Sequence, residues 1–142
     1  NRKNYPTAIE LYTRILQSSI ETRLRTIILI HRGIAYFCQT RYEKAHEDFT
    51  AATHCEPDNS KAFYHLGTVN RVMGDYTSAI RHLQQSLKLN PYRLEALMES
   101  ANVLFEMGNY SAVLEYCEKA LRINPELPSV LKLHSMTQAK IS

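Results

Sequence analysis

The stretch MGDYTSAI at residues 73–80 returns as MGNYSAVL at residues 107–114, 34 positions later. A repeat of roughly 20 to 50 residues is typical of proteins built from stacked units. Seven columns, two of which pass through these stretches, keep the 34-residue interval over three copies. They are Tyr42, Tyr76 and Tyr110; Ala45, Ala79 and Val113; Phe49, Leu83 and Cys117; Ala52, Ser86 and Ala120; Pro57, Pro91 and Pro125; Leu29, Phe63 and Leu97; and Gly33, Gly67 and Ala101. The columns indicate three copies of one structural unit.

Each unit contains two amphipathic stretches, with apolar residues at the three- and four-residue spacing that places them on one face of a helix. Gly74 lies between the stretches of one unit and suits a left-handed cap that ends the first helix. Asn59 and its neighbours Asp58 and Ser60 offer N-cap oxygens for that helix. The unit is therefore predicted to be a helical hairpin, and the fold class to be all-α.

This pattern resembles the tetratricopeptide repeat (TPR) family, whose signature runs Trp-x-x-Leu-Gly-x-x-Tyr, then Ala-x-x-x-Phe, then Pro. Residues 26–59 match it best, through Leu29, Gly33, Tyr36, Ala45, Phe49 and Pro57. The resemblance implies a right-handed superhelical solenoid of antiparallel helical hairpins over residues 1–142. It divides the chain into a partial repeat with its connection (1–25), full repeats (26–59, 60–93 and 94–127) and a terminal helix (128–142). Because the chain begins in mid-repeat, we expect a fragment of a longer protein.

Three departures from the family pattern stand out. Arg32 replaces an expected Leu, Thr40 replaces a turn Gly and Val113 replaces a small Ala, which predicts locally looser packing. Tyr5 and Tyr42 are 37 rather than 34 residues apart. The three extra residues lengthen either the turn near 18–25 or the helix that follows it.

Composition excludes several classes of protein. With 44% hydrophobic and 22% charged residues the chain reads as a globular domain, and no apolar run approaches the roughly 20 residues that cross a membrane. Cys38, Cys55 and Cys117 are odd in number and widely spaced, which favours reduced thiols inside a cell. We expect an intracellular, cytoplasmic protein, with a nuclear or ciliary location left open.

The formal net charge of +3 arises mainly from the N-terminal region. A nucleic-acid surface would need denser clustering of cations and interleaved aromatic residues. The sequence therefore predicts against nucleic-acid binding, although one competing hypothesis assigns it to Arg2, Lys3, Arg14, Arg23 and Arg25.

Neither a catalytic site nor a metal or cofactor site is predicted. His31 and His65 occupy one column on adjacent first helices, about 10 Å apart by ordinary helix packing and too far to share a metal ion. His46 and His54 are expected on a solvated outer helix, as is the acidic run that includes Asp48. His82 has no obvious partner. With no nucleophile motif or phosphate loop present, the chain is predicted not to be an enzyme.

The resemblance implies instead that partners bind a concave groove lined by the first helices of the hairpins. The predicted partner-binding residues are His31, Phe37, Lys61, Tyr64, His65, Arg71, Glu95, Met98, Glu99, Asn102 and Phe105. Cations lie early in this set and acids late, so the expected ligand is an extended or helical segment of a partner protein, apolar in its middle and oppositely charged at its ends.

Chaperone-binding TPR domains resemble one another in a clamp of Lys, Asn and Arg side chains that holds a terminal carboxylate. The corresponding columns here hold mostly Ile, Tyr, His, Thr and Glu, which predicts against heat-shock chaperone tails as partners. The function predicted is a non-catalytic protein–protein interaction scaffold. The alternative is a substrate-recruiting or regulatory TPR segment of a larger enzyme or multi-subunit assembly.

Overall fold

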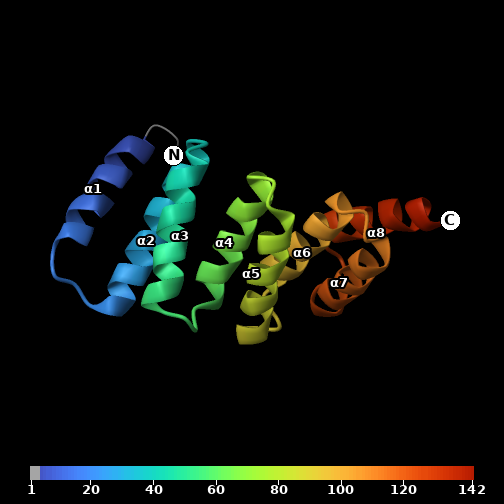
Figure 1. The fold of residues 1–142 in the computed structure, drawn as a ribbon. Coiled ribbons are helices and arrows are strands. Elements are labelled where there is room, and N and C mark those ends of the chain that lie inside the picture. Colours follow the sequence, from blue (N-terminus) through green and yellow to red (C-terminus); the bar gives the residue numbers. More distant parts are fainter. Residues whose placement is uncertain (1–3) are drawn as a thin grey trace.

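A computed structural model describes residues 4–142, and within that range the chain forms helices and no strand. The helices are α1 (Tyr5–Gln17), α2 (Thr22–Cys38), α3 (Tyr42–Cys55), α4 (Ser60–Val72), α5 (Tyr76–Leu89), α6 (Leu94–Glu106), α7 (Tyr110–Ile123) and α8 (Pro128–Ile141). Each packs mainly on its neighbours along the chain, and the pairs α2–α3, α4–α5 and α6–α7 form hairpins. Figure 1 shows the stack running from α1 at one end to the C-terminus at the other. The predicted all-α solenoid of hairpins is confirmed.

The glycine columns explain how closely the two helices of a hairpin approach. A Cβ added at Gly33 would lie 2.5 Å from Cε1 of Phe49, and one at Gly67 would lie 2.6 Å from Cγ of Leu83. Phe49 and Leu83 are fully buried. A glycine on the first helix of a hairpin thus leaves room for a large side chain of the second helix, as close packing of a core requires.

The hairpin turns use left-handed backbone. Gly74 and Gly108 have φ of 85° and 79°, and Thr40 adopts φ of 59° at the equivalent turn of α2–α3. Immediately after the two glycine turns, Asp75 and Asn109 accept hydrogen bonds from backbone N–H groups in the first turns of α5 and α7. The repeated stretches MGDYTSAI and MGNYSAVL therefore form a turn and the cap of the helix that follows it.

The three extra residues lie in a helix. The connections before α2, α4, α6 and α8 all contain four residues. α2 has 17 residues where α4 has 13, whereas α1 has 13 where α3 has 14. The gain of four and the loss of one account for the difference of three.

The expectation of looser packing at Arg32 is wrong. Its Nε and Nη2 donate to Oδ2 and Oδ1 of Asp48 at 2.8 and 2.7 Å, and Nη1 donates to Oγ1 of Thr13 at 3.1 Å. The Asp48 side chain is 5% exposed, so it lies in this joint and not on a solvated face. A bidentate ion pair replaces apolar packing between α1, α2 and α3.

Candidate functional site

The first helices α2 and α4, with α1, line a groove made of two adjoining hollows that share Ile34. One hollow, of about 180 Å³, is lined by Ile34, Phe37, Phe49, Tyr64, His65 and Thr68. The other, of about 230 Å³, is lined by Asn4, Tyr5, Ala8, Tyr12, His31, Ile34 and Ala35. We call this surface the inner groove. Four of the predicted partner-binding residues, His31, Phe37, Tyr64 and His65, lie in its walls.

His65 has the most unusual environment of these residues. Its ring stacks on Phe49 with centroids 5.2 Å apart and packs against Tyr64 at 4.8 Å. Its Nε2 is buried and has no hydrogen-bond partner within the described residues. Burial, followed by the charges of Lys61, Arg93 and His31, lowers the pKa of His65 to about 4. The ring is therefore neutral at pH 7, with one nitrogen unsatisfied beside an open hollow.

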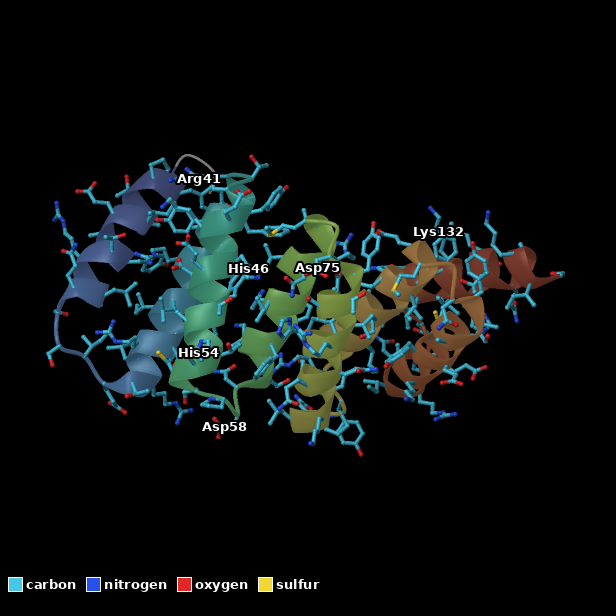
Figure 2. The ribbon with its side chains drawn as sticks, viewed as in Figure 1. Arg41, His46, His54, Asp58, Asp75 and Lys132 are labelled. Carbon is cyan, nitrogen blue, oxygen red and sulfur yellow. The ribbon has the colours of Figure 1, made fainter. Side chains whose placement is uncertain are left out.

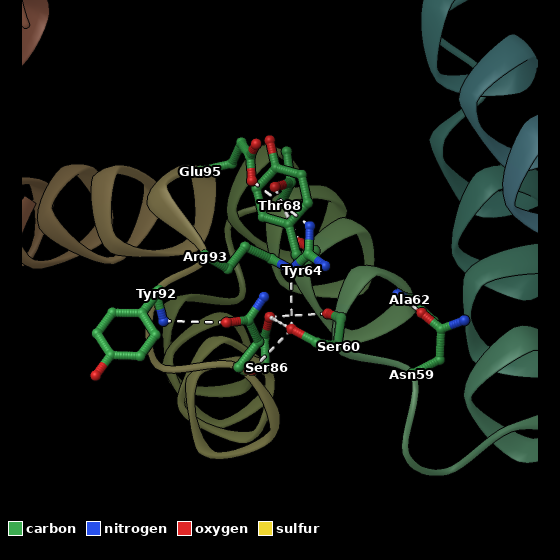
Figure 3. Close-up of polar contacts among 10 residues, drawn as sticks. Asn59, Ser60, Ala62, Tyr64, Thr68, Ser86, Tyr92, Arg93 and Glu95 are labelled. Carbon is green, nitrogen blue, oxygen red and sulfur yellow. Dashed lines mark hydrogen bonds and ion pairs between the residues drawn. The ribbon is translucent and has the colours of Figure 1, made fainter. Parts of the chain in front are cut away.

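Cations surround this ring. Lys61 is exposed at the start of α4, and Arg93 precedes α6. Nε of Arg93 donates to Oγ of Ser60 at 2.9 Å, and its Nη1 lies 3.6 Å from Oε2 of Glu95. Figure 3 shows the Arg93 side chain reaching Ser60, with their hydrogen bond dashed. The bond to Ser60 fixes where this guanidinium lies on the groove side.

A buried pair of serines anchors Arg93 in turn. Oγ of Ser60 donates to the carbonyl of Ser86, and Oγ of Ser86 donates to the carbonyl of Ser60, both at 2.8 Å (Figure 3). Sequence reasoning missed Arg93 because it considered helical columns only. The signal available was a cation at a helix N-terminus, a place where the helix dipole favours acids.

The charges of the predicted site are not divided between two ends. Arg71 bonds through Nε to Oε2 of Glu99, and its Nη1 lies 3.4 Å from Oε1 of Glu106. Glu99 is only 8% exposed. Burial works against the charged form of Arg71, but the bonds to these acids raise its pKa overall. The carboxylates of Glu99 and Glu106 are thus both paired with Arg71. Within residues 4–142, Lys61 has no ion-pair partner.

The remaining predicted residues lie further along the stack. Met98 and Asn102 border a hollow of about 40 Å³ between α6, α7 and α8. Phe105 makes an edge contact with Tyr110 at 5.4 Å, as Phe37 does with Tyr42 at 5.2 Å. The inner groove thus does not extend as one hollow over all eleven predicted residues.

The basic N-terminal residues are partly engaged. Arg14 pairs with Glu10 at 2.8 Å, and Arg25 donates to the carbonyls of Leu16 and Ser18. Arg2 and Lys3 lie outside the described residues. Two of the five cations of the nucleic-acid hypothesis therefore have protein partners.

Residues 4–142 contain no cluster of three or more His, Cys, Asp or Glu side chains that could hold a metal ion. Across the same residues, no helix is both long and apolar enough to span a membrane. The three cysteines are free thiols, and burial raises the pKa of Cys117.

Comparison with known proteins supports the fold. Residues 73–137 match the family model described as tetratricopeptide repeat. The co-chaperone sgt12 of Aspergillus fumigatus, named a heat-shock protein cognate co-chaperone, is 40% identical over 78 residues, which are 55% of this chain and 22% of that protein. The chain spans less than a quarter of the length of the curated relatives it matches.

Two solved structures share the arrangement of helices. MamA aligns with a TM-score of 0.89 at 21% identity, covering 98% of this chain and 80% of that one. The first TPR of Spaghetti (RPAP3), bound to the HSP90 peptide SRMEEVD, aligns with a TM-score of 0.80 at 18% identity, covering 87% and 98%. The chain thus shares the fold of a TPR domain that was solved with a bound peptide.

The prediction against heat-shock chaperone tails is wrong. A matching relative is named as a co-chaperone, and a domain of the same fold carries an HSP90 peptide. The prediction relied on the absence of particular clamp residues, and it overlooked Arg93, whose charge acts on His65 together with that of Lys61. The helical hairpins, the match of residues 73–137 to the repeat family and the fold shared with MamA agree, and the chain has the fold of a tetratricopeptide repeat solenoid.

Proposed function

We propose that this chain is a non-catalytic interaction scaffold whose inner groove binds an extended segment of a partner protein. The observation that carries the proposal is the buried, unpaired Nε2 of His65 beside the 180 Å³ hollow. Buried polar atoms in native structures are nearly always hydrogen-bonded, so an exception needs an explanation. The ring of His65 lines the hollow, and a ligand that displaces the side chains covering Nε2 would supply the missing partner.

The lining favours a particular ligand chemistry. Ile34, Phe37 and Tyr64 present apolar and aromatic surface to the hollow, which suits an aliphatic side chain. Lys61 and Arg93 beside it suit a carboxylate. An acidic C-terminal peptide with an apolar residue, such as SRMEEVD, combines both features, so we propose heat-shock chaperone tails as a partner class for this groove.

Fluorescence polarisation with labelled SRMEEVD tests the proposal. We expect Lys61→Ala to weaken binding by up to about fivefold, the range of an exposed ion pair. Lys88→Ala removes the same charge from an exposed position on α5 and should leave binding unchanged. Equal affinity of the two variants, or no binding by the wild type, would reject chaperone tails.

A separate experiment tests the groove without assuming the peptide. The double variant Tyr64→Ala and His65→Ala is compared with the wild type by crosslinking and mass spectrometry in cell extract. Loss of the captured proteins supports the inner groove. If the double variant captures the same proteins, the partner binds another face of the solenoid.

The alternative function, a recruiting or regulatory segment of a larger enzyme or assembly, keeps one observation in its favour. The curated relatives are several times longer than the matched region. The sequence that flanks residues 1–142 in its gene separates the two hypotheses, because a catalytic domain there would make the scaffold part of an enzyme.

A further inference from the structure

A polar cluster links α4, α5 and α6 at one joint of the solenoid. It consists of Ser60 at the start of α4, Ser86 in α5 and Arg93 immediately before α6 (Figure 3). At the equivalent positions one repeat later the chain has three apolar residues, which pack in the C-terminal core: Leu94, Ala120 and Leu127. A joint between two repeats therefore packs without these polar groups, and their presence here needs another explanation.

The cluster fixes the guanidinium of Arg93 in one orientation. Its Nε donates to Oγ of Ser60 at 2.9 Å, and Oγ of Ser86 lies 3.0 Å from that same oxygen. Ser86 is fully buried and Ser60 is 8% exposed, so water scarcely competes for these bonds. Because the serines engage only Nε, the two terminal nitrogens of Arg93 are left to bind an acid.

The charge of Arg93 acts on the inner groove. Burial, the charge of Lys61 and then the charge of Arg93 lower the pKa of His65, whose ring lines the hollow of about 180 Å³. The Arg93 side chain is 23% exposed. Lys61 is exposed and lacks an ion-pair partner within residues 4–142, so it loses more side-chain freedom when it binds an acid. Arg93, which is already fixed, binds a carboxylate at a smaller entropic cost.

The chain places a carboxylate of its own beside Arg93. Oε2 of Glu95 lies 3.6 Å from Nη1 of Arg93, beyond the length of a hydrogen bond. The Glu95 side chain is 58% exposed, and an ion pair of this kind is weak. Burial and the charges of Glu99 and Glu95 raise the pKa of Tyr64, another residue that lines the hollow. Glu95 therefore lies where an acid of a ligand would approach, and it is easily displaced.

We propose that Arg93, positioned by Ser60 and Ser86, binds a carboxylate of the acidic segment in the inner groove. The ligand displaces Glu95 from the guanidinium. This inference rests on the proposed function, which supplies the acidic ligand. A neutral segment cannot replace the charge of Glu95, so the groove discriminates against it.

NMR of the Arg93 Nε–H group follows this cation directly. Two acidic probes are titrated, the chaperone peptide SRMEEVD and a capped Glu-Glu dipeptide, and a capped Gln-Gln dipeptide is the neutral control. Both acidic probes should shift the Arg93 signal, because the guanidinium exchanges one carboxylate for another in a new geometry. The neutral dipeptide should leave the signal in place.

The two acidic probes separate this inference from the proposal of chaperone tails. If SRMEEVD binds and the Arg93 signal stays in place, the groove binds the tail and the role of Arg93 is wrong. If Glu-Glu shifts the signal and SRMEEVD does not bind, Arg93 is an acid-binding residue and chaperone tails are rejected. If neither acidic probe moves the signal, the inference is overturned.

Variants guided by the neighbouring repeats test the positioning role. Ser86→Ala introduces the residue found at that position in both adjacent repeats, Ala52 and Ala120, so it should fold. We expect Ser86→Ala to weaken SRMEEVD binding about threefold and Arg93→Leu to weaken it about tenfold. The acid-free peptide SRMQQVN with an amidated C-terminus should bind the wild type and both variants equally. Equal losses for the two peptides would show a merely structural effect and contradict the positioning role.

A double-variant cycle tests the displacement of Glu95. Glu95→Gln should strengthen SRMEEVD binding about two- to fivefold, because the ligand no longer competes with an internal acid. The same change in Arg93→Leu should have no effect. Asp58→Asn removes one acid from the exposed loop before α4 (Figure 2) and should not strengthen binding. A gain in both backgrounds, or an equal gain from Asp58→Asn, would mean that the loss of any acid favours the peptide, and would refute displacement at Arg93.

Discussion

At the scale of the residue, His65 links stability to pH. Its pKa is about 4 in the folded chain and about 6.5 when unfolded. Below pH 6.5 the His65 ring of the unfolded chain becomes protonated, whereas in the folded chain it stays neutral down to about pH 4. The contribution of His65 to stability is therefore complete above pH 6.5 and declines as the pH falls, by at most about 3 kcal/mol.

His65→Phe keeps an aromatic ring against Phe49 and removes this proton uptake. We expect urea unfolding of the variant to depend less on pH between 7.5 and 4.5 than that of the wild type. At pH 7.5 the variant should be as stable or about 1 kcal/mol more stable, because a buried unpaired nitrogen is lost. Burial also lowers the pKa of His82, and that effect cancels in the comparison. Identical pH dependence of both proteins would mean that His65 titrates normally.

At the scale of the element, the joint between α1, α2 and α3 depends on an ion pair. Asp48→Ala leaves Arg32 partly buried without its carboxylate, and we expect a loss of about 3 kcal/mol in the free energy of unfolding. The double variant Arg32→Leu and Asp48→Leu should recover most of that loss, because apolar side chains can fill the joint. Urea denaturation measures both.

An exposed pair in the same region provides the control. Arg14 and Glu10 are 70% and 63% exposed, so Glu10→Ala should change stability by less than about 1 kcal/mol. If Asp48→Ala is equally mild, the buried pair does not hold the joint.

At the scale of the whole molecule, packing between neighbours predicts that damage stays local. In Gly67→Leu the new side chain meets Leu83, and overpacking should reduce stability by about 1 to 3 kcal/mol or more. Hydrogen exchange should accelerate first in α4 and α5, while α6 to α8 keep more of their protection. A uniform loss of protection would show that the solenoid unfolds as one unit.

The repeated columns were sufficient to predict the hairpins, because a small residue such as Gly33 opposite a large one such as Phe49 is required wherever two helices approach closely. Polar partners were harder to foresee. Arg71 and Glu99 are 28 residues apart, and only the packing of successive hairpins brings them together. The partner of His82 lies in its own hairpin, where Asn70 on α4 donates to its Nδ1, and a pattern built on apolar columns does not predict such a polar pair.

The second-helix columns carry a signal in the sequence for the hollow of about 600 Å³ between α3 and α5. Asp48, His82 and Tyr116 occupy one repeat position and differ in chemistry. The family resemblance points to the first helices, so it predicts residues of the inner groove. The hollow between α3 and α5 depends on side-chain positions in space, which the resemblance does not provide.

Helices that pack mainly on their neighbours also determine how the chain reaches its fold. The main packing contacts join helices adjacent in sequence, so little of the chain has to be ordered before the first favourable contacts form. Domains dominated by such local contacts fold in microseconds to milliseconds, and each hairpin can serve as a starting point. Folding of this solenoid should therefore be fast and should begin at more than one place along the stack.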